Sequence, residues 1–366
     1  MDMGFEEVLE QEARDKIITG QTSEMGKRFE ERLARTKEHP KKLLTGATAC
    51  FSKKVWSWKG HLITASAVLR TSWREPLLLR KRESLAIKKG INMGAIESKK
   101  NGLEGVFNPR SVAVIGASNQ RGKWGYMLLE RIIGGGFKGE IYPVNPKGGE
   151  IQGLKAYPNV KDIEGPVDLA VIGIPASVVQ GAVEDCVAKG VKGLIIVTAG
   201  YGETGTEGKK LEDEIAKTVQ ASGTRLVGPN CIGIINTAAS LNASSLPFAK
   251  GDIGFVCQSG GLCEDVRLLL QQRKWGFSKL ISMGNQTDIR FHEYLDYLKD
   301  DEDTKVVLLH IEEVKEGKRF LKAAKEVVKK KPIVALKVGQ TTAGERAVMS
   351  HTGSLAGRYE VYQAAF

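Results

Sequence analysis

Residues 111–125 read SVAVIGASNQRGKWG, in which a five-residue, mostly apolar run leads directly into a glycine-containing loop. A short apolar run that ends at glycine and is followed by an amphipathic segment predicts a buried strand, a tight turn and a helix. The free N–H groups at the start of such a helix favour a nucleotide or phosphate ligand. Neither GxGxxG nor the P-loop pattern is present, because Gly116 and Gly122 lie six residues apart and Trp124 follows Lys123. An ordinary tight turn therefore stays an open alternative.

The same alternation of short apolar runs and helical segments continues along the chain and predicts α/β architecture with doubly wound parallel sheets. In a first unit we expect strands over 111–115, 140–144, 169–172, 193–197 and 225–227, and helices over 125–133, 178–189 and 207–221. After Lys250 we expect strands over 253–256, 279–282, 306–311 and 333–336, and helices over 262–273 and 317–330. Since the chain stops at Phe366 within another helical segment, we expect the second unit to be incomplete.

Length and composition bound the class of protein. With 366 residues, of which 42% are hydrophobic, the chain is long enough for two α/β domains. No apolar run approaches the roughly 20 residues that span a bilayer, and the acidic N-terminus lacks the apolar segment of a secretory signal. The five cysteines form no CxxC pair, which argues against structural zinc and against a disulfide framework. We therefore expect no metal site, no membrane partner and a cytoplasmic location.

The net charge of +11 originates in one stretch, since residues 41–100 carry fourteen basic and three acidic side chains. A basic arm for nucleic acid or an anionic surface is one interpretation. The other is that residues 1–103 form a basic, poorly ordered N-terminal extension, with Met93 as a plausible internal start. We expect the extension and no nucleic-acid partner, because the stretch contains no recognisable motif.

Small or polar residues also follow three other predicted strands. Asn145 and Lys147 lie where dinucleotide enzymes carry an acidic residue, so the lysine suits a ligand with an extra phosphate or is a surface residue of a proline-stiffened turn. Pro175 follows the third strand, and Asn230 and Cys231 follow the last, although Cys231 also suits plain packing. Ligands of such sheets gather at the carboxyl ends of the strands, so these loops support one another.

His351, one of five histidines, lies in a run of small and hydroxylated residues over Ser350–Gly357. A neutral imidazole is a nucleophile near pH 7, and glycine-rich backbone leaves N–H groups close to it. Such a ring can accept a phosphoryl group and hold it as phosphohistidine. A histidine in an ordinary surface loop is the alternative.

Together these motifs resemble the ADP-forming acetate–CoA ligase family, also called NDP-forming acyl-CoA synthetases, which are relatives of the succinyl-CoA synthetase α subunit. The resemblance covers about 105–366 and is carried by five motifs in the expected order: FNPRSVAVIGAS at 107–118, PVNPK at 143–147, GPNC at 228–231, QSG at 258–260 and SHTGSLAG at 350–357. It implies a Rossmann-like CoA-binding domain over 104–249. A flavodoxin-like ligase domain over 250–366, incomplete at its C-terminal end, is expected to follow.

The resemblance also implies the chemistry and the site. In this family acyl-CoA and phosphate give an acyl phosphate, whose phosphoryl group passes to a histidine and then to ADP, in a reversible cycle. His351 matches that histidine, and Glu312 matches the carboxylate that orients it, although Glu312 by itself suits a solvated position at a strand end. Phosphate is expected at Ser259, Gly260 and Gly261. Coenzyme A is expected at Gly116, Ser118, Gly122, Lys123, Gly125, Asn145, Lys147, Pro175, Asn230 and Cys231.

Several departures limit what the resemblance implies. Glu313 occupies a position where the family usually has glycine, and Cys263, Glu264 and Asp265 replace small residues at the start of the phosphate-facing helix. The ATP-grasp module that binds ADP or ATP with Mg²⁺ is missing, so a separate subunit or a further C-terminal domain must supply it. The expected activity is therefore that of part of an acid–thiol ligase acting on a small carboxylic acid, phosphate and CoA. A non-catalytic CoA sensor or scaffold is the alternative.

Overall fold

The computed structural model describes residues 56–58, 61–65 and 102–338, with backbone alone in the first two ranges. Its first sheet has five parallel strands in the order β4-β3-β7-β8-β9. The strands are β3 (Ser111–Ile115), β4 (Glu140–Val144), β7 (Leu169–Ile172), β8 (Gly193–Ile196) and β9 (Arg225–Val227). After β3 the chain forms β4 on one side of it and then β7 on its other side. A topological switch point therefore lies between β3 and β7.

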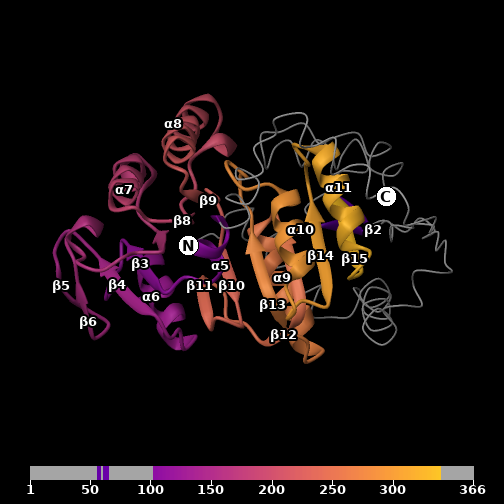
Figure 1. The fold of residues 1–366 in the computed structure, drawn as a ribbon, viewed down its shortest axis with the longest axis horizontal. Coiled ribbons are helices and arrows are strands. Elements are labelled where there is room, and N and C mark those ends of the chain that lie inside the picture. Colours follow the sequence, from indigo (N-terminus) through magenta and orange to yellow (C-terminus); the bar gives the residue numbers. More distant parts are fainter. Residues whose placement is uncertain (1–55, 59–60, 66–101, 339–366) are drawn as a thin grey trace, which may run out of the picture.

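Helices cover both faces of this sheet, with α6 on one face and α7 and α8 on the other (Figure 1). They are α6 (Trp124–Gly134), α7 (Ala176–Lys189) and α8 (Thr206–Ser222). Alternate strand residues pack toward opposite helices: Val114 and Val171 lie in the core cluster of α6, whereas Ile115 and Ile172 lie in that of α7. Burial on both faces explains why the strands are continuous apolar runs.

The second sheet has eight strands in the order β1-β2-β15-β14-β12-β13-β10-β11. Its parallel part is β12 (Lys250–Cys257), β13 (Phe277–Ser282), β14 (Val306–Ile311) and β15 (Ile333–Val338). One face packs on α9 (Gly260–Gln272), and the other packs on α10 (Phe291–Asp300) and α11 (Gly317–Val327). The two successive parallel α/β sheets confirm the predicted fold class.

Antiparallel hairpins extend the second sheet at both edges, and a third hairpin forms a separate small sheet. β10 (Gly233–Asn236) and β11 (Leu241–Ser244) precede residue 250 in the chain and yet join the second sheet through β13. At its other edge β15 pairs with β2 (His61–Ala65), which pairs with β1 (Trp56–Trp58). Beside the first sheet, β5 (Gly149–Ile151) and β6 (Leu154–Ala156) form a two-stranded hairpin. The short helices are α5 (Glu104–Phe107), η2 (Val160–Asp162) and η3 (Gly202–Thr204).

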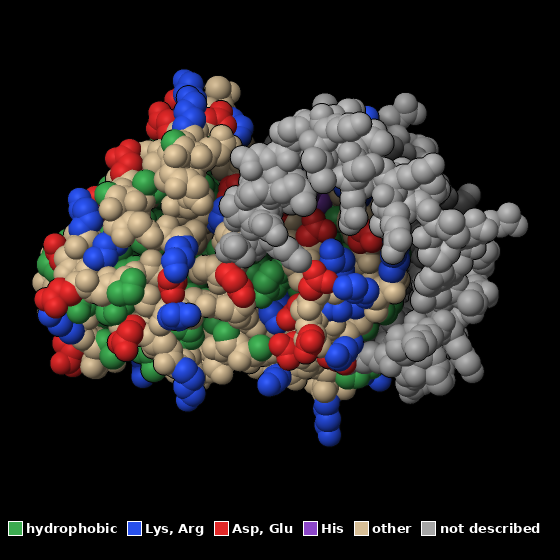
Figure 2. Space-filling model, in the orientation of Figure 1, with side chains coloured by type: hydrophobic (Ala, Val, Ile, Leu, Met, Phe, Trp, Pro, Cys, Tyr) green, Lys and Arg blue, Asp and Glu red, His purple; other side chains and the backbone are tan. Residues whose placement is uncertain are grey.

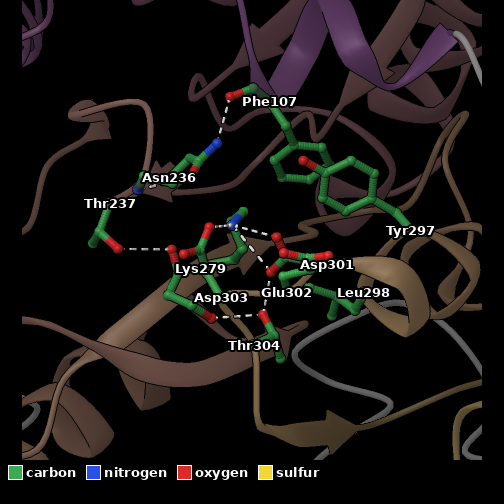
Figure 3. A network of polar contacts seen from close by, with 12 residues as sticks. Phe107, Asn236, Thr237, Lys279, Tyr297, Leu298, Asp301, Glu302, Asp303 and Thr304 are labelled. Atoms are coloured by element: carbon green, nitrogen blue, oxygen red, sulfur yellow. Dashed lines mark hydrogen bonds and ion pairs between the residues drawn. The ribbon is translucent and has the colours of Figure 1, made fainter. Parts of the chain in front are cut away.

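One apolar cluster runs from α6 through β10 and β11 to α10 and α11, so the two sheets share a core. A buried polar network supports this junction (Figure 3). The ammonium group of Lys279, which is 1% exposed, donates to both carboxylate oxygens of Asp301 at 2.9 and 3.0 Å. Nearby, the amide of Asn236 donates to the carbonyl of Phe107 at 2.8 Å. The segment before the first sheet is thereby attached to the second sheet.

The predicted strands and helices agree with the structure to within a few residues, but some elements were not predicted. The helix over 317–330 ends earlier, at Val327. Helix α10 was missed, although Phe291, Tyr294, Leu295 and Leu298 have helical spacing and are buried. The three hairpins were also missed, because their strands are only three to five residues long.

Candidate active site at the carboxyl edges of the two sheets

The loop after β3 is shaped by glycines at the switch point. Gly116 has φ of 91°, and a Cβ there would lie 2.6 Å from the side chain of Ile174. A Cβ on Gly125 would lie only 1.8 Å from the carbonyl oxygen of Gly116, so the first turn of α6 rests directly on the end of β3. Gly122 has φ of 86° and open space around its Cα. The start of α6 thus faces the crevice with little side-chain bulk in between.

Predicted CoA residues Ser118 and Asn145 stabilise this loop from within. The hydroxyl of Ser118 accepts a hydrogen bond from the N–H of Gln120 at 3.0 Å. The amide of Asn145 donates to the carbonyl of Ala117 at 2.9 Å, and its oxygen accepts from the N–H of Lys147 at 3.0 Å. Asn145 therefore ties the end of β4 to the loop after β3, which is a structural use of that side chain.

Cationic and apolar side chains surround the same crevice. Arg121, Lys123 and Lys147 are exposed. Trp124, at the first position of α6, is 44% exposed, and Val178, in the first turn of α7, is 54% exposed. α6 and α7 cover opposite faces of the sheet, so the two exposed side chains lie at helix starts on opposite faces. Pro175 is also exposed and caps the start of α7.

Gly228–Gly233 carries the chain from the first sheet to the second. Gly228 and Pro229 are joined by a cis peptide bond. The N–H of Asn230 donates to the carbonyl of Thr198 at 2.9 Å, and its side-chain amide donates to Asn285 at 3.2 Å. A Cβ on Gly260 would lie 2.9 Å from the side chain of Ile232. This segment therefore contacts the loops at the carboxyl edges of both sheets.

Asn285 extends this polar contact to two carboxylates. Its amide donates to Glu203 at 2.6 Å and to Glu212 at 2.7 Å. Burial alone would raise the pKa of Glu203, but hydrogen bonds from Asn285 and from the N–H groups of Gly200 and Tyr201 outweigh it and lower that pKa. Glu203 is therefore held as a carboxylate that fixes the two edges relative to each other.

Cys231 lies just beyond this junction and faces the interior. It is 4% exposed, and its thiol donates to the carbonyl of Ile196 at 3.3 Å. Burial raises the pKa of the thiol to about 12, so the group is neutral at physiological pH. In this position the side chain of Cys231 contributes packing.

The edge of the second sheet has the geometry of an anion site. Ser259 is the N-cap of α9, and its hydroxyl accepts from the N–H of Leu262. Gly260 and Gly261 form the first turn, and a Cβ on Gly261 would meet no atom within 4 Å. The open backbone at the positive end of a 13-residue helix suits a phosphate group. The three predicted phosphate residues thus lie together.

Glu312 follows β14, the strand next to β12, so it lies at the same sheet edge as the start of α9. It is 5% exposed, which differs from the solvated glutamate that the isolated sequence would suggest. Its N–H donates to the side-chain oxygen of Gln258 at 2.6 Å. His351, the other predicted catalytic residue, lies outside the described residues.

The glycine-lined start of α6 and the exposed cations beside it suit an anionic ligand. The open first turn of α9 fits a phosphoryl group next to a buried carboxylate. Two comparisons of the sequence agree with this geometry. A model of CoA-binding domains matches residues 110–237, and a model of succinyl-CoA ligase-like flavodoxin domains matches residues 250–366.

Alignment with related proteins over about 260 residues decides the family. Succinate–CoA ligase [ADP-forming] subunit alpha 2 of Archaeoglobus fulgidus is 31% identical over 258 residues, which cover 67% of this chain and 84% of that protein. Acetate–CoA ligase [ADP-forming] II subunit alpha of Pyrococcus furiosus is 47% identical over 267 residues, covering 72% of this chain and 58% of that protein. The chain belongs to the ADP-forming acetate–CoA ligase family.

A solved structure of the same family has a similar fold. The dinucleotide-forming acetyl-coenzyme A synthetase 1 of Ca. Korarchaeum cryptofilum, in complex with phosphate and ADP, aligns with a TM-score of 0.70 at 38% identity. The alignment covers 72% of this chain and 57% of that one. The chain thus spans about 58% of the length of the two Pyrococcus furiosus acetate–CoA ligase α subunits that it matches.

The acidic departures from the family pattern are partly neutralised in this member. Glu264 lies in the first turns of α9, and its two carboxylate oxygens accept hydrogen bonds from the guanidinium of Arg267 at 2.6 and 2.7 Å. This ion pair neutralises the charge of Glu264. Cys263 is fully buried beneath the helix. The N–H of Glu313 donates to Gln258 at 3.1 Å. These contacts leave the first turn of α9 open.

Within the described part of the chain, no cluster of three or more histidine, cysteine or acidic side chains has a geometry that could hold a metal ion. No helix of that part is long and apolar enough to cross a membrane. On the face shown in Figure 2, basic and acidic side chains are interspersed over the described residues.

Three side chains near the site were not predicted from the sequence. Gln258 was noticed only as part of a motif, and Lys337 and Trp124 were not assigned a role. The signal for Trp124 is a large aromatic residue at the first position of a helix that follows a glycine loop. No sequence signal distinguishes Lys337, since a lysine inside a buried strand is recognised only when its partners are known.

Proposed function

We propose that this chain is the CoA-binding and phosphohistidine-bearing part of an ADP-forming acyl-CoA synthetase. It would convert acyl-CoA, ADP and phosphate reversibly into a carboxylic acid, ATP and CoA. The observation that carries the proposal is the junction at Gly228–Gly233, which brings the edge suited to coenzyme A and the edge suited to phosphate into contact through Ile232 and Gly260. The names of the Pyrococcus furiosus and Archaeoglobus fulgidus relatives reported above, both CoA ligase subunits, support catalysis over a non-catalytic sensor or scaffold.

Coenzyme A would lie across the carboxyl edge of the first sheet. Its phosphates would contact the start of α6 and the cations Arg121, Lys123 and Lys147, and Trp124 and Val178 would flank the adenine or pantetheine. Its thiol end would extend past the backbone of 230–233 toward α9. The backbone N–H groups of Gly260 and Gly261 would bind the phosphoryl group.

His351 would take up the phosphoryl group, with Glu312 as its charge partner. β15 is parallel to β14, so the chain leaves the second sheet at Val338, on the edge where Glu312 lies. A carboxylate beside the ring favours the positively charged phosphoimidazole, because opposite charges stabilise each other in a buried site. Coenzyme A supplies the thiol that receives the acyl group.

The cycle also requires a partner. ADP or ATP with Mg²⁺ would bind to an ATP-grasp module, supplied by a β subunit or by a further domain, and the phosphoryl group would move between that module and His351. We also propose a reducing, cytoplasmic setting, which is supported by four buried cysteines in the described residues that form no disulfide.

The test combines the full chain, an ATP-grasp subunit and γ-labelled ATP. We expect an acid-labile, base-stable label on the chain that is lost in His351→Ala, and calorimetric binding of coenzyme A that is unchanged in the same variant. A label that survives in His351→Ala would refute the catalytic assignment. Binding of CoA without any labelling would favour the sensor or scaffold instead.

A further inference from the structure

Both polar groups of the Glu312 backbone are held by buried side chains from neighbouring strands. The side-chain oxygen of Gln258, which directly follows β12, accepts from the N–H of Glu312 at 2.6 Å and from the N–H of Glu313 at 3.1 Å. The ammonium group of Lys337, in β15, donates to the carbonyl of Glu312 at 2.9 Å and also to the carbonyl of Val338.

The three residues come from three adjacent parallel strands, in the order β12, β14, β15. Cys257 pairs with His310 and Ile311 pairs with Lys337, so the register places all three at one edge of the sheet. Gln258 is 9% exposed and Lys337 is 1% exposed. Backbone groups at a strand end ordinarily bind to water or to the next strand, whereas here two buried side chains take that place.

Burying an amide and an ammonium group is unfavourable unless each is hydrogen-bonded, and apolar residues would fill the same space more favourably. Polar residues at these positions therefore serve geometry more than stability. Glu312 has its N–H fixed from one side and its carbonyl from the other, so these two side chains set the position of its backbone. The start of α9 follows Gln258 directly, so the same side chain sets the position of Glu312 relative to the phosphate-binding turn.

We propose that Gln258 and Lys337 are positioning residues for phosphoryl transfer, which hold the backbone of Glu312 in register with the start of α9. This inference rests on the proposed function. Lys337 in addition places a positive charge beside the backbone carbonyl of Glu312.

The step that they assist is balanced as follows. The lone pair of the neutral His351 imidazole forms the N–P bond while the P–O bond of an acyl phosphate breaks. The carboxylate leaves with the electron pair of that bond. The ring keeps its other N–H and becomes positively charged, and the carboxylate of Glu312 balances this charge. A displaced or protonated Glu312 would slow the step without changing the binding of coenzyme A.

The experiment uses the full chain and acetyl phosphate labelled in its phosphoryl group, so that no partner subunit is needed. Gln258→Leu removes the shared acceptor, whereas Gln258→Glu retains an acceptor but places a second carboxylate beside Glu312. Lys337→Met removes the ammonium group, and Lys318→Met, at an exposed position of α11, is its matched control. The rate of labelling is measured from pH 5 to 9, together with the CoA dissociation constant and the melting temperature.

We expect Gln258→Leu and Lys337→Met to slow labelling at least tenfold while the CoA dissociation constant changes less than twofold. We expect Gln258→Glu to shift the pH of half-maximal labelling upward by about one unit, because an added negative charge favours the protonated form of both the Glu312 carboxyl and the imidazole. Lys318→Met should match the parent chain. This pH shift is the readout that a merely structural role would not change.

If the parent chain is labelled at His351 and Gln258→Glu keeps its pH profile, the positioning role is refuted while the proposed function stands. The same holds if Gln258→Leu is labelled at the parent rate. If Lys337→Met does not fold, the two Gln258 variants still decide the question. If the parent chain acquires no label that depends on His351, the proposed function fails, and this inference fails with it.

Discussion

Gly125→Ala tests whether the start of α6 rests on the end of β3. The added Cβ would lie 1.8 Å from the carbonyl oxygen of Gly116, 2.6 Å from its carbonyl carbon and 3.1 Å from the Cα of Ala117. All three atoms belong to the backbone, so no side chain can rotate away. Since ordinary contact begins at 3.4 Å, the helix start has to move by roughly 1.6 Å relative to the strand.

Overpacking of a well-packed site costs about 1–3 kcal/mol, and a backbone clash of this size belongs at the upper end. At about 2–4 °C for each kcal/mol in a domain of this size, the melting temperature should fall by about 6–12 °C. Because the displaced N-terminus no longer faces the phosphates, CoA should bind at least about tenfold more weakly, which corresponds to roughly 1.4 kcal/mol.

Gly134→Ala is the matched control in the same helix. Gly134 is the last residue of α6, and a Cβ there would meet no atom within 4 Å. Alanine lowers the conformational entropy of the unfolded chain, so this variant should be more stable by up to about 1 kcal/mol. Differential scanning calorimetry and calorimetric CoA titration measure both variants. Equal melting temperatures and equal CoA affinities in the two would refute the packing argument.

Three further predictions concern charge and the crevice. Burial alone would raise the pKa of Asp168, but the ammonium group of Lys192 and a backbone N–H outweigh it and lower that pKa. The Asp168 carboxylate therefore stabilises the folded state above its ordinary pKa of 3.8, and this stabilisation is lost as the pH falls below that value. Asp168→Asn should reduce the acid sensitivity of unfolding, measured by urea titration at several pH values. Arg225→Leu should lower the free energy of unfolding by up to about 3 kcal/mol, because Asp288, bonded at 2.8 Å, stays partly buried without its cation. Trp124→Ala should weaken CoA binding about tenfold and abolish the CoA-dependent quenching of tryptophan fluorescence.

Each of these has an outcome that contradicts it. A urea midpoint that depends on pH as steeply in Asp168→Asn as in the parent would show that Lys192 does not act on this carboxylate. Arg225→Leu with parental stability would mean that the pair contributes nothing to joining β9 to the second sheet. Quenching that persists in Trp124→Ala would locate the reporting indole elsewhere.

Much of the fold follows from local sequence. The runs at 111–115, 140–144, 169–172 and 306–311 become strands with the expected bounds, because most of their residues are apolar and buried, although Glu140 at the start of the second run is exposed. The glycines of the first loop also indicate a turn suited to phosphate, since such a turn needs positive φ and a close approach of the backbone to its ligand. The family resemblance adds Glu312, which periodicity alone would have assigned to solvent.

Pairing between distant segments was decided only in three dimensions. The sequence does not show that β10 and β11 leave the first unit for the second sheet, or that a hairpin at 56–65 pairs with β15, because short strands gain their stability from partners far along the chain. Asn145 and Cys231 were recognised from the sequence as polar or reactive residue types. In the structure the amide of Asn145 donates to the carbonyl of Ala117, whereas Cys231 is buried and donates to the carbonyl of Ile196.

Sequence therefore determined which residue types are available at each strand end, and with them the kind of chemistry. Tertiary structure decided which of those side chains share an edge. Gln258 and Lys337 are 79 positions apart, and only the parallel order of β12, β14 and β15 brings both to the backbone of Glu312. The physical reason is that hydrogen bonds and burial depend on neighbours in space, whereas composition and periodicity record neighbours along the chain.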